Sequence, residues 1–155
     1  MIYYRPSEYA IRALVHLAEV PRGTYAVVRQ IAAEEQIPSY FLSKILQQLA
    51  RKGLLRSRKG PGGGFALRAP ADEIPLLNVV QAVDGLADYQ KCVCGFGDCS
   101  EDMPCVLHKS WKALRSRVMN YLRRKTIADL ETVEQNLLHK RQHSKRARVR
   151  RASTS

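Results

Sequence analysis

All four cysteines of this 155-residue chain lie in one short segment, residues 90–108, and a histidine closes that segment: Cys92, Cys94, Cys99, Cys105 and His108. Glycine, proline, aspartate and serine fill the space between them and favour a loop. Several thiols and an imidazole on one loop can bind one soft metal centre. The chemistry that the sequence offers is therefore that of a zinc site, an iron–sulfur cluster or a thiol switch.

The spacing of the cysteines bears on which of these it is. Structural zinc sites usually pair Cys-x2-Cys motifs, whereas one, four and five residues separate these cysteines. Wide spacing with intervening glycines favours a bulkier iron–sulfur cluster, whose sulfides accept hydrogen bonds from backbone amides. A cluster with fewer than four cysteine ligands takes a histidine or a carboxylate as its last ligand, and that ligand is easily displaced. We therefore interpret the loop as a candidate sensor.

The charge of the chain predicts a polyanionic partner. The formal net charge is +12, and residues 139–155 contribute seven Lys and Arg with no acidic residue, which leaves 19 − 14 = +5 for the rest. No Asp or Glu occurs between Glu35 and Asp72. A folded basic surface thus remains when the tail is set aside, as in many nucleic-acid-binding proteins.

A pair of helices and a β-hairpin, preceded by one further helix, are predicted around this acid-free window. A helix over residues 7–20, capped by Ser7, precedes a helix pair over 27–35 and 39–52, and Pro38 suits the start of the second of the pair. Two short strands, 54–58 and 65–68, flank a glycine-rich tip. A helix pair followed by a basic hairpin predicts a winged helix-turn-helix, whose second helix enters the major groove of DNA.

The helix over residues 39–52 has an apolar face, Leu42, Ile45, Leu46 and Leu49, and an opposite polar face. On the polar face, Ser43, Gln47 and Gln48 can bond base edges, and Lys44 and Arg51 can reach bases or phosphates. In the wing, Arg58 and Lys59 suit phosphates, and the glycines of the tip, among them Gly60, Gly62 and Gly63, permit close approach to the sugar–phosphate backbone.

The remaining chain is predicted to be helical around the cysteine loop. A helix over 74–84 precedes the loop, and a long helix over 105–125 follows it with a narrow apolar seam: Leu107, Trp111, Leu114, Val118 and either Tyr121 or Leu122. Such a seam packs either on its own domain or against the same helix of a second subunit. Thr126 can cap a last helix to residue 138, with Asp129 at the third position. The tail over 139–155 is predicted to be disordered.

These features together resemble a known family. The matching segments are residues 9–14 (YAIRAL), 49–55 (LARKGLL), 59–65 (KGPGGGF) and 83–85 (VDG), followed by the cysteine loop and a helix with His108 and Trp111. Over roughly residues 1–138 the chain resembles the IscR/NsrR-type winged-helix transcriptional regulators. The resemblance implies a homodimeric DNA-binding regulator, usually a repressor, that carries a [2Fe–2S] or [4Fe–4S] cluster reporting iron–sulfur status, nitric oxide, iron or redox stress.

The resemblance also implies particular residues. For the cluster it implies Cys92, Cys99 and Cys105, with Cys94 as a substitute for Cys92 and with His108 or the partner subunit's Glu8 as fourth ligand. For DNA it implies Ser39, Tyr40, Ser43 and Lys44 at the base-reading turn and Lys59 in the wing. This chain departs from the family at the first cysteine, because Cys92 and Cys94 straddle the usual position.

The sequence therefore predicts a mostly α-helical fold with a small β-hairpin wing and a long dimerisation helix. The predicted organisation is a DNA-binding domain over residues 1–85, a cluster-binding loop over 86–105, dimerisation and carboxyl-terminal helices over 105–138, and the tail over 139–155. The expected partners are palindromic duplex DNA and a second copy of the chain, with no small-molecule substrate. We expect no membrane span, a cytoplasmic location and no enzymatic activity, since no nucleotide loop, catalytic carboxylate pair or activated nucleophile is evident. A small electron carrier is the alternative from another class.

Overall fold

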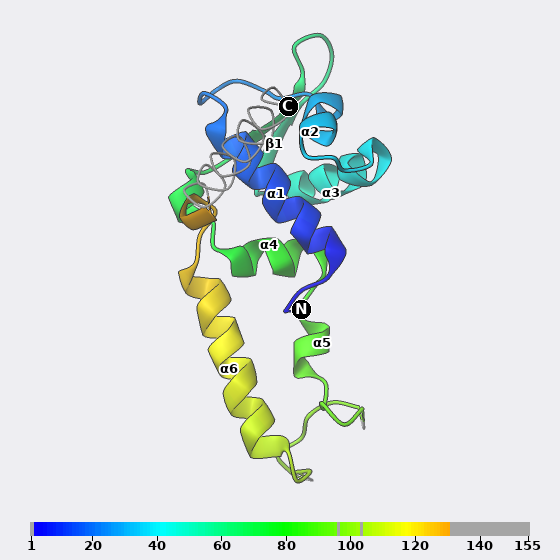
Figure 1. Cartoon of the computed structure of the whole chain (residues 1–155), viewed down its shortest axis with the longest axis vertical. Helices are drawn as coiled ribbons and strands as arrows, with labels where there is room; N and C mark the ends of the chain where they lie inside the picture. The colour runs from blue at the N-terminus through cyan, green and yellow to red at the C-terminus, as the bar shows by residue number, and fades with distance from the viewer. Residues whose placement is uncertain (1, 96, 103, 131–155) are drawn as a thin grey trace, which may run out of the picture.

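The computed structural model describes residues 2–95, 97–102 and 104–130. In Figure 1 the helices and strands follow one another along the chain as α1 (Arg5–Glu19), α2 (Val28–Glu34), α3 (Ser39–Arg51), β1 (Leu55–Arg58), β2 (Gly64–Leu67), the 3-10 helix η1 (Ala71–Glu73), α4 (Leu76–Val83), α5 (Ala87–Gln90) and α6 (His108–Arg124). This order confirms the predicted mostly helical fold with a two-stranded hairpin. The last predicted helix is described only to residue 130, and the tail lies outside the described residues.

The hydrophobic core lies where α1, α3 and α4 pack together. The predicted apolar face of α3 is buried, with Leu42, Leu46 and Leu49 fully inaccessible to solvent. Leu14 of α1 and Val79 of α4 are equally buried. Fully burying such side chains stabilises the fold by about 1.5–3 kcal/mol each. The core therefore fixes α3 on one side and leaves its opposite side exposed.

The start of α1 differs from the prediction that Ser7 caps it. The helix begins two residues earlier, at Arg5, and Pro6 lies in its first turn. Ser7 is fully buried and its Oγ has no hydrogen-bond partner among the described residues. The amide of Tyr4 instead donates to Oδ2 of Asp84 at 2.8 Å. A carboxylate at the end of α4 thus fixes the start of α1, and no side chain of the described residues caps the helix.

The wing is an antiparallel hairpin in which Leu55 pairs with Leu67 and Arg58 with Gly64. A further bridge joins Ala26, just before α2, to Phe65 through two backbone hydrogen bonds of 2.9 Å. At Gly64, where φ is +142°, an added Cβ would overlap the carbonyl of Ala26. The glycine therefore lets the wing lie directly against the segment that leads into α2.

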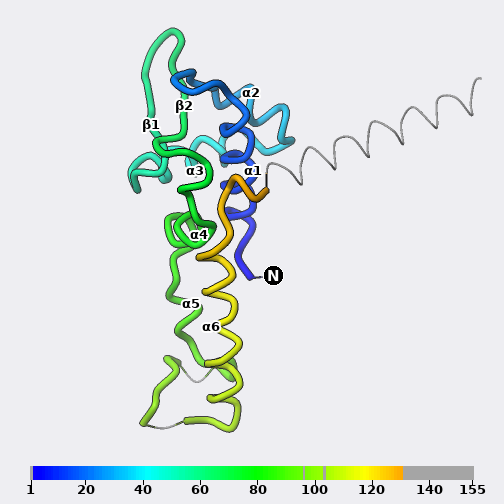
Figure 2. Tube along the Cα trace, turned by 90° about the vertical axis from the view of Figure 1, so that its left-hand side faces the viewer, coloured from blue at the N-terminus to red at the C-terminus, as the bar shows by residue number. Residues whose placement is uncertain are grey.

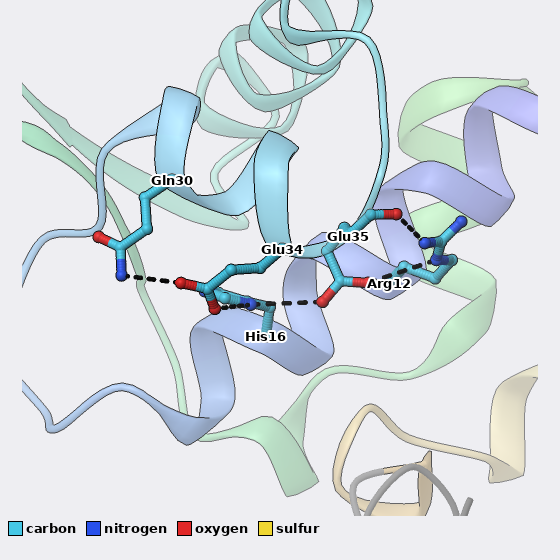
Figure 3. Close-up of polar contacts among 5 residues, drawn as sticks. All are labelled: Arg12, His16, Gln30, Glu34 and Glu35. Carbon is cyan, nitrogen blue, oxygen red and sulfur yellow. Dashed lines mark hydrogen bonds and ion pairs between the residues drawn. The ribbon is translucent and has the colours of Figure 1, made fainter. Parts of the chain in front are cut away.

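A polar cluster ties α1 to the end of α2 (Figure 3). His16 Nδ1 lies 3.3 Å from Oε1 of Glu35 and 3.7 Å from Oε2 of Glu34. Arg12 also contacts Glu35, through its carboxylate at 3.4 Å and through its backbone carbonyl. Glu35 is 8% exposed, and the hydrogen bond from His16 to it is the main cause of the raised pKa of His16. The cluster holds the turn before α3 against α1.

The other end of the molecule is a projecting arm. Helices α5 and α6 extend side by side from the α1–α4 body and the cysteine loop joins their far ends (Figures 1 and 2). At its near end, α6 is anchored by Leu122, which is fully buried, and by a bridge between Pro75 and Thr126. Thr126 also donates its amide to Asp129 at 2.8 Å, as expected for the start of a further helix. None of the helices in the described part of the chain has the length and apolar character needed to cross a bilayer.

Candidate DNA-binding surface and cysteine loop

The exposed side of α3 carries most of the predicted DNA-binding residues. Ser39 begins the helix, and Tyr40 is 68% exposed beside it. Lys44 Nζ lies 4.4 Å from the centre of the Tyr40 ring, so the cation and the ring are arranged as a cation–π pair. Lys44, Gln47 and Arg51 are also exposed, and Ser43 is half-buried beside Gln47. The structure thus brings the α3 candidates onto one surface.

Gln48 does not belong to this surface, contrary to the prediction. Its Nε2 donates to the carbonyl oxygens of Ala82 at 2.8 Å and Val83 at 3.2 Å. Those carbonyls lie in the last turn of α4, where a helix has no internal donors for them. Gln48 therefore joins α3 to α4. The helical period of the sequence placed Gln48 on the polar face, and it gave no sign that α4 packs against this edge of α3.

The wing presents a second basic surface. Arg58, Lys59, Gly60 and Gly62 are exposed, and the guanidinium of Arg58 lies 5.9 Å from the centre of the Tyr25 ring. Gly63 is different: it is buried, and a Cβ there would overlap the carbonyl of Arg58. Gly63 therefore shapes the wing and does not offer its own surface to DNA.

The cysteine loop begins as a tight backbone turn. The amide of Gly95 donates to the carbonyl of Cys92 at 2.9 Å, and the amide of Cys92 donates to the carbonyl of Gly97 at 2.8 Å. Gly95 and Gly97 have φ of +78° and +92°, which glycine adopts without steric strain. The amide of Cys99 then donates to the carbonyl of Gln90 at 3.0 Å. These bonds fold the first three cysteines back toward α5.

The structure divides the soft ligands into two groups. Sulfurs of Cys92, Cys94 and Cys105 all lie within 4.8 Å of one another, with 3.8 Å between those of Cys92 and Cys105. The sulfur of Cys99 lies instead 3.2 Å from Nδ1 of His108. The pKa of Cys94 is raised, first by desolvation and then by the thiol of Cys105. Cys94, which the sequence offered as a substitute, is thus a full member of the larger group.

His108 lies at the start of α6, with its Nδ1 3.2 Å from the sulfur of Cys99. It is buried, and its Nε2 lies 3.4 Å from Oε2 of Glu101 without hydrogen-bond geometry. Glu101 also pairs with Lys112, and that pair is the main reason that the pKa of Glu101 is lowered. An imidazole between a carboxylate and a thiol is oriented as metal-binding histidines usually are.

Glu8, the other candidate for the fourth ligand, lies in the first turn of α1. Within one chain α1 belongs to the α1–α4 body, and the arm separates this body from the cysteine loop (Figure 1). Four thiols and an imidazole on one loop are nevertheless the donors that iron–sulfur clusters use. The chemistry of the residues within a single chain therefore fits such a cluster with His108 as a donor.

The cysteine loop is connected mechanically to the helices. Trp111 of α6 donates its Nε1 to the carbonyl of Lys91 at 3.0 Å, next to the first cysteine. Arg115 donates to the carbonyl of Tyr89 in α5 at 3.0 Å. At the upper end of α5, the hydroxyl of Tyr4 donates to Asp88 at 2.7 Å. A movement of the loop would therefore also displace α5, α6 and the start of α1.

Phe41 and Tyr25 also lie on these surfaces, although they were not predicted from the sequence. Phe41 is 59% exposed on α3 and packs edge-on against Tyr40. Tyr25 lies under Arg58 although it is far from it in sequence. An aromatic residue just outside the apolar period of α3 was a usable signal for Phe41. Nothing in the local sequence indicated Tyr25, because the wing reaches it only through the bridge at Ala26.

Comparison with known proteins gives one consistent family. The Rrf2 family, described as iron-dependent transcriptional regulators, matches residues 4–132. An HTH-type transcriptional regulator of Aquifex aeolicus is 34% identical over 140 residues, covering 89% of this chain and 96% of that protein. The HTH-type transcriptional regulator IscR of Vibrio parahaemolyticus is 33% identical over 124 residues, covering 80% of this chain and 73% of that protein.

Solved structures agree in fold. CymR, the global cysteine regulator of B. subtilis, superposes with a TM-score of 0.71 at 21% identity, covering 84% of this chain and 95% of that one. The IscR of T. potens superposes with a TM-score of 0.65 at 16% identity, covering 86% of each chain. At this level of identity the likeness concerns the fold.

Proposed function

Because the chain belongs to the Rrf2 family of DNA-binding transcriptional regulators, we propose that it is a homodimeric repressor controlled by an iron–sulfur cluster in the cysteine loop. Members of this family are regulators and not enzymes. The observation that carries the proposal is the placement of every soft ligand on one loop that is hydrogen-bonded to α6. A DNA-binding regulator works where the chromosome is, so we assign the protein to the cytoplasm.

The proposed ligands are Cys92, Cys99 and Cys105, with His108 or the partner subunit's Glu8 as the fourth, and with Cys94 able to replace Cys92. Bound there, a [2Fe–2S] or [4Fe–4S] cluster would supply a centre that changes with oxidation, nitric oxide or loss of iron. The pairing of Cys99 with His108 at 3.2 Å favours the histidine, since both would then approach the centre together.

Dimerisation is proposed through the outer face of α6. Leu114 and Tyr121 on that face are 52% and 53% exposed. Leu114 also lines a groove of about 430 Å³ between α6, α5 and the amino-terminal residues, together with Ile2, Trp111 and Val118 among others. An exposed apolar seam on a long basic helix suits a twin helix. Replacing Leu114 with Glu should convert a dimer to a monomer in light scattering.

Control of DNA binding is proposed to run along the arm. Trp111 of α6 donates a hydrogen bond to the cysteine loop. Asp84 and Asp88, where the arm leaves the α1–α4 body, accept hydrogen bonds from Tyr4. Gln48 then joins the end of α4 to α3, the helix proposed to read DNA. A displaced loop would shift α3 relative to its twin, and on a palindromic site the spacing of the two recognition helices sets affinity.

The proposed DNA contacts divide by chemistry. Base edges would be read by Ser39, Tyr40, Ser43, Lys44 and Gln47, and phosphates would be bound by Arg51, Arg58 and Lys59, with Gly60 and Gly62 at the tip. The test is anaerobic purification with iron, sulfide and absorbance analysis. We expect a brown dimer that loses its colour in Cys99→Ala and Cys105→Ala. A colourless protein with no sulfide would refute the cluster.

A thiol switch without a cluster is the second candidate. It is favoured by the 3.8 Å separation between the sulfurs of Cys92 and Cys105, because an oxidant can join two neighbouring thiols in a disulfide. A structural relative is described as a global cysteine regulator. Treating iron-free protein with peroxide and then with a reductant distinguishes the two: reversible loss of DNA binding supports the switch, and unchanged binding argues against it.

A further inference from the structure

The three-sulfur group defined by Cys92, Cys94 and Cys105 fits a different occupant from an iron–sulfur cluster. A tetrahedral zinc ion with Zn–S bonds of about 2.3 Å spaces its sulfurs about 3.8 Å apart. The sulfurs of Cys92 and Cys105 are already 3.8 Å apart, and all three lie within 4.8 Å of one another. In a cluster, bridging sulfides separate the irons, so thiolates on different irons are held farther apart.

We propose that cluster-free protein binds one thiophilic ion, of the Zn²⁺ or Cu⁺ type, through Cys92, Cys94 and Cys105, with Cys99 outside the ligand set. Both ions favour thiolates, and three protein ligands leave one position for water or a small thiol on zinc. The inference goes beyond the proposed function, because it concerns another ion and another set of cysteines and holds even if no cluster assembles.

The backbone explains why these three cysteines meet. The bond from the Gly95 amide to the Cys92 carbonyl closes a turn, which returns Cys94 toward Cys92. From the other side, Trp111 fixes α6 to the carbonyl of Lys91, and this brings Cys105, just before α6, back to the turn. Cys92 and Cys105 are half-buried whereas Cys94 is exposed, so an ion can enter from solvent and become partly shielded.

Cys99 is placed for another role. Its amide is bound to the carbonyl of Gln90, and its sulfur contacts His108 and not the three-sulfur group. Zinc or copper binding at the three sulfurs would therefore occupy Cys92 and Cys105 and leave Cys99 with His108. Since the proposed cluster needs the same two cysteines, ion and cluster would exclude each other. Excess thiophilic metal would then compete with the cluster for the regulator.

The test uses full-length, reduced, metal-free protein and compares Cys94→Ser with Cys99→Ser, two cysteines of the same loop. Zn²⁺ affinity is measured anaerobically by competition with a chromophoric chelator. We expect one Zn²⁺ per chain in the unaltered protein and affinity within about threefold of it in Cys99→Ser. In Cys94→Ser, affinity should fall by more than the roughly 10- to 100-fold that a supporting contact alone contributes. Copper is tested in the same way with a Cu⁺ chelator.

Two results would overturn the inference: Cys94→Ser binding Zn²⁺ and Cu⁺ as tightly as the unaltered protein, or Cys99→Ser losing as much affinity as Cys94→Ser. Reconstitution of the same variants with iron and sulfide separates this inference from the proposed function. If the unaltered protein binds Zn²⁺ through Cys94 but never turns brown, only the cluster is refuted. If it turns brown but Cys94 has no effect on either ion, only the three-sulfur site is refuted.

Discussion

Two adjacent glutamines of α3 should have separable effects when each is replaced by alanine. Gln48 donates two hydrogen bonds, of 2.8 and 3.2 Å, to the last carbonyls of α4. Each such bond contributes about 0.5–1.5 kcal/mol net, so Gln48→Ala should lower the free energy of unfolding by about 1–3 kcal/mol. Gln47 is exposed, and its side chain donates a hydrogen bond of 3.4 Å to the hydroxyl of Ser43. Gln47→Ala should therefore leave stability within about 0.5 kcal/mol.

DNA binding should show the opposite order. If Gln47 reads a base edge, Gln47→Ala loses about 1–3 kcal/mol, or roughly 5- to 150-fold, on a specific site. Gln48→Ala should keep the sequence preference, because its side chain faces α4. The assays are denaturant unfolding and fluorescence anisotropy on a duplex selected by the unaltered protein from random DNA, at one fixed salt concentration. A stable Gln48→Ala with lost specificity, or an unstable Gln47→Ala, would refute this assignment.

Three further predictions concern the wing, the α1–α2 cluster and the arm. Gly64→Ala should destabilise the fold and weaken DNA binding more than Gly62→Ala, because both strain φ but only the first overlaps backbone; equal effects in unfolding and anisotropy would contradict this. The hydrogen bond to Glu35 is the main cause of the raised pKa of His16. The stability that this pair gives the fold is therefore fully present below the unfolded pKa of about 6.5, and it is lost as the pH rises through the folded pKa. His16→Gln should then cost more stability at pH 6 than at pH 9, and a pH-independent difference would count against the pair. Trp111→Phe removes a hydrogen bond to the loop, so amides of residues 91–99 should exchange hydrogen faster while the core is unchanged; unaltered exchange would show that the bond is not what holds the loop.

The winged-helix part of the fold was predictable because local signals and global packing agree there. Leu42, Leu46 and Leu49 recur at helical spacing, and all three are buried. The glycine-rich tip joins β1 and β2, which pair as the predicted antiparallel hairpin. Where a distant residue supplies the partner, prediction failed. Asp84, not Ser7, receives the amide at the start of α1, and no local pattern encodes a bond across 80 residues.

The cysteine loop was predictable in composition and not in arrangement. Clustering alone indicated the four cysteines and His108 as candidate ligands. Which sulfurs meet depends on the turn closed at Gly95 and on the long-range bond from Trp111, and spacing determines neither. The resemblance implied Cys92, Cys99 and Cys105, whereas the structure gathers Cys94 with Cys92 and Cys105. The difference between these two sets of cysteines is what the Cys94→Ser and Cys99→Ser comparison measures.

We propose that the state of the cysteine loop sets the affinity of the protein for DNA. The most direct measurement is an anaerobic anisotropy titration of one operator duplex with cluster-loaded protein and with the same preparation after removal of iron and sulfide. We expect the two dissociation constants to differ by roughly 5- to 150-fold, the usual range of coupling between two sites. Superimposable titrations from the two forms would contradict it.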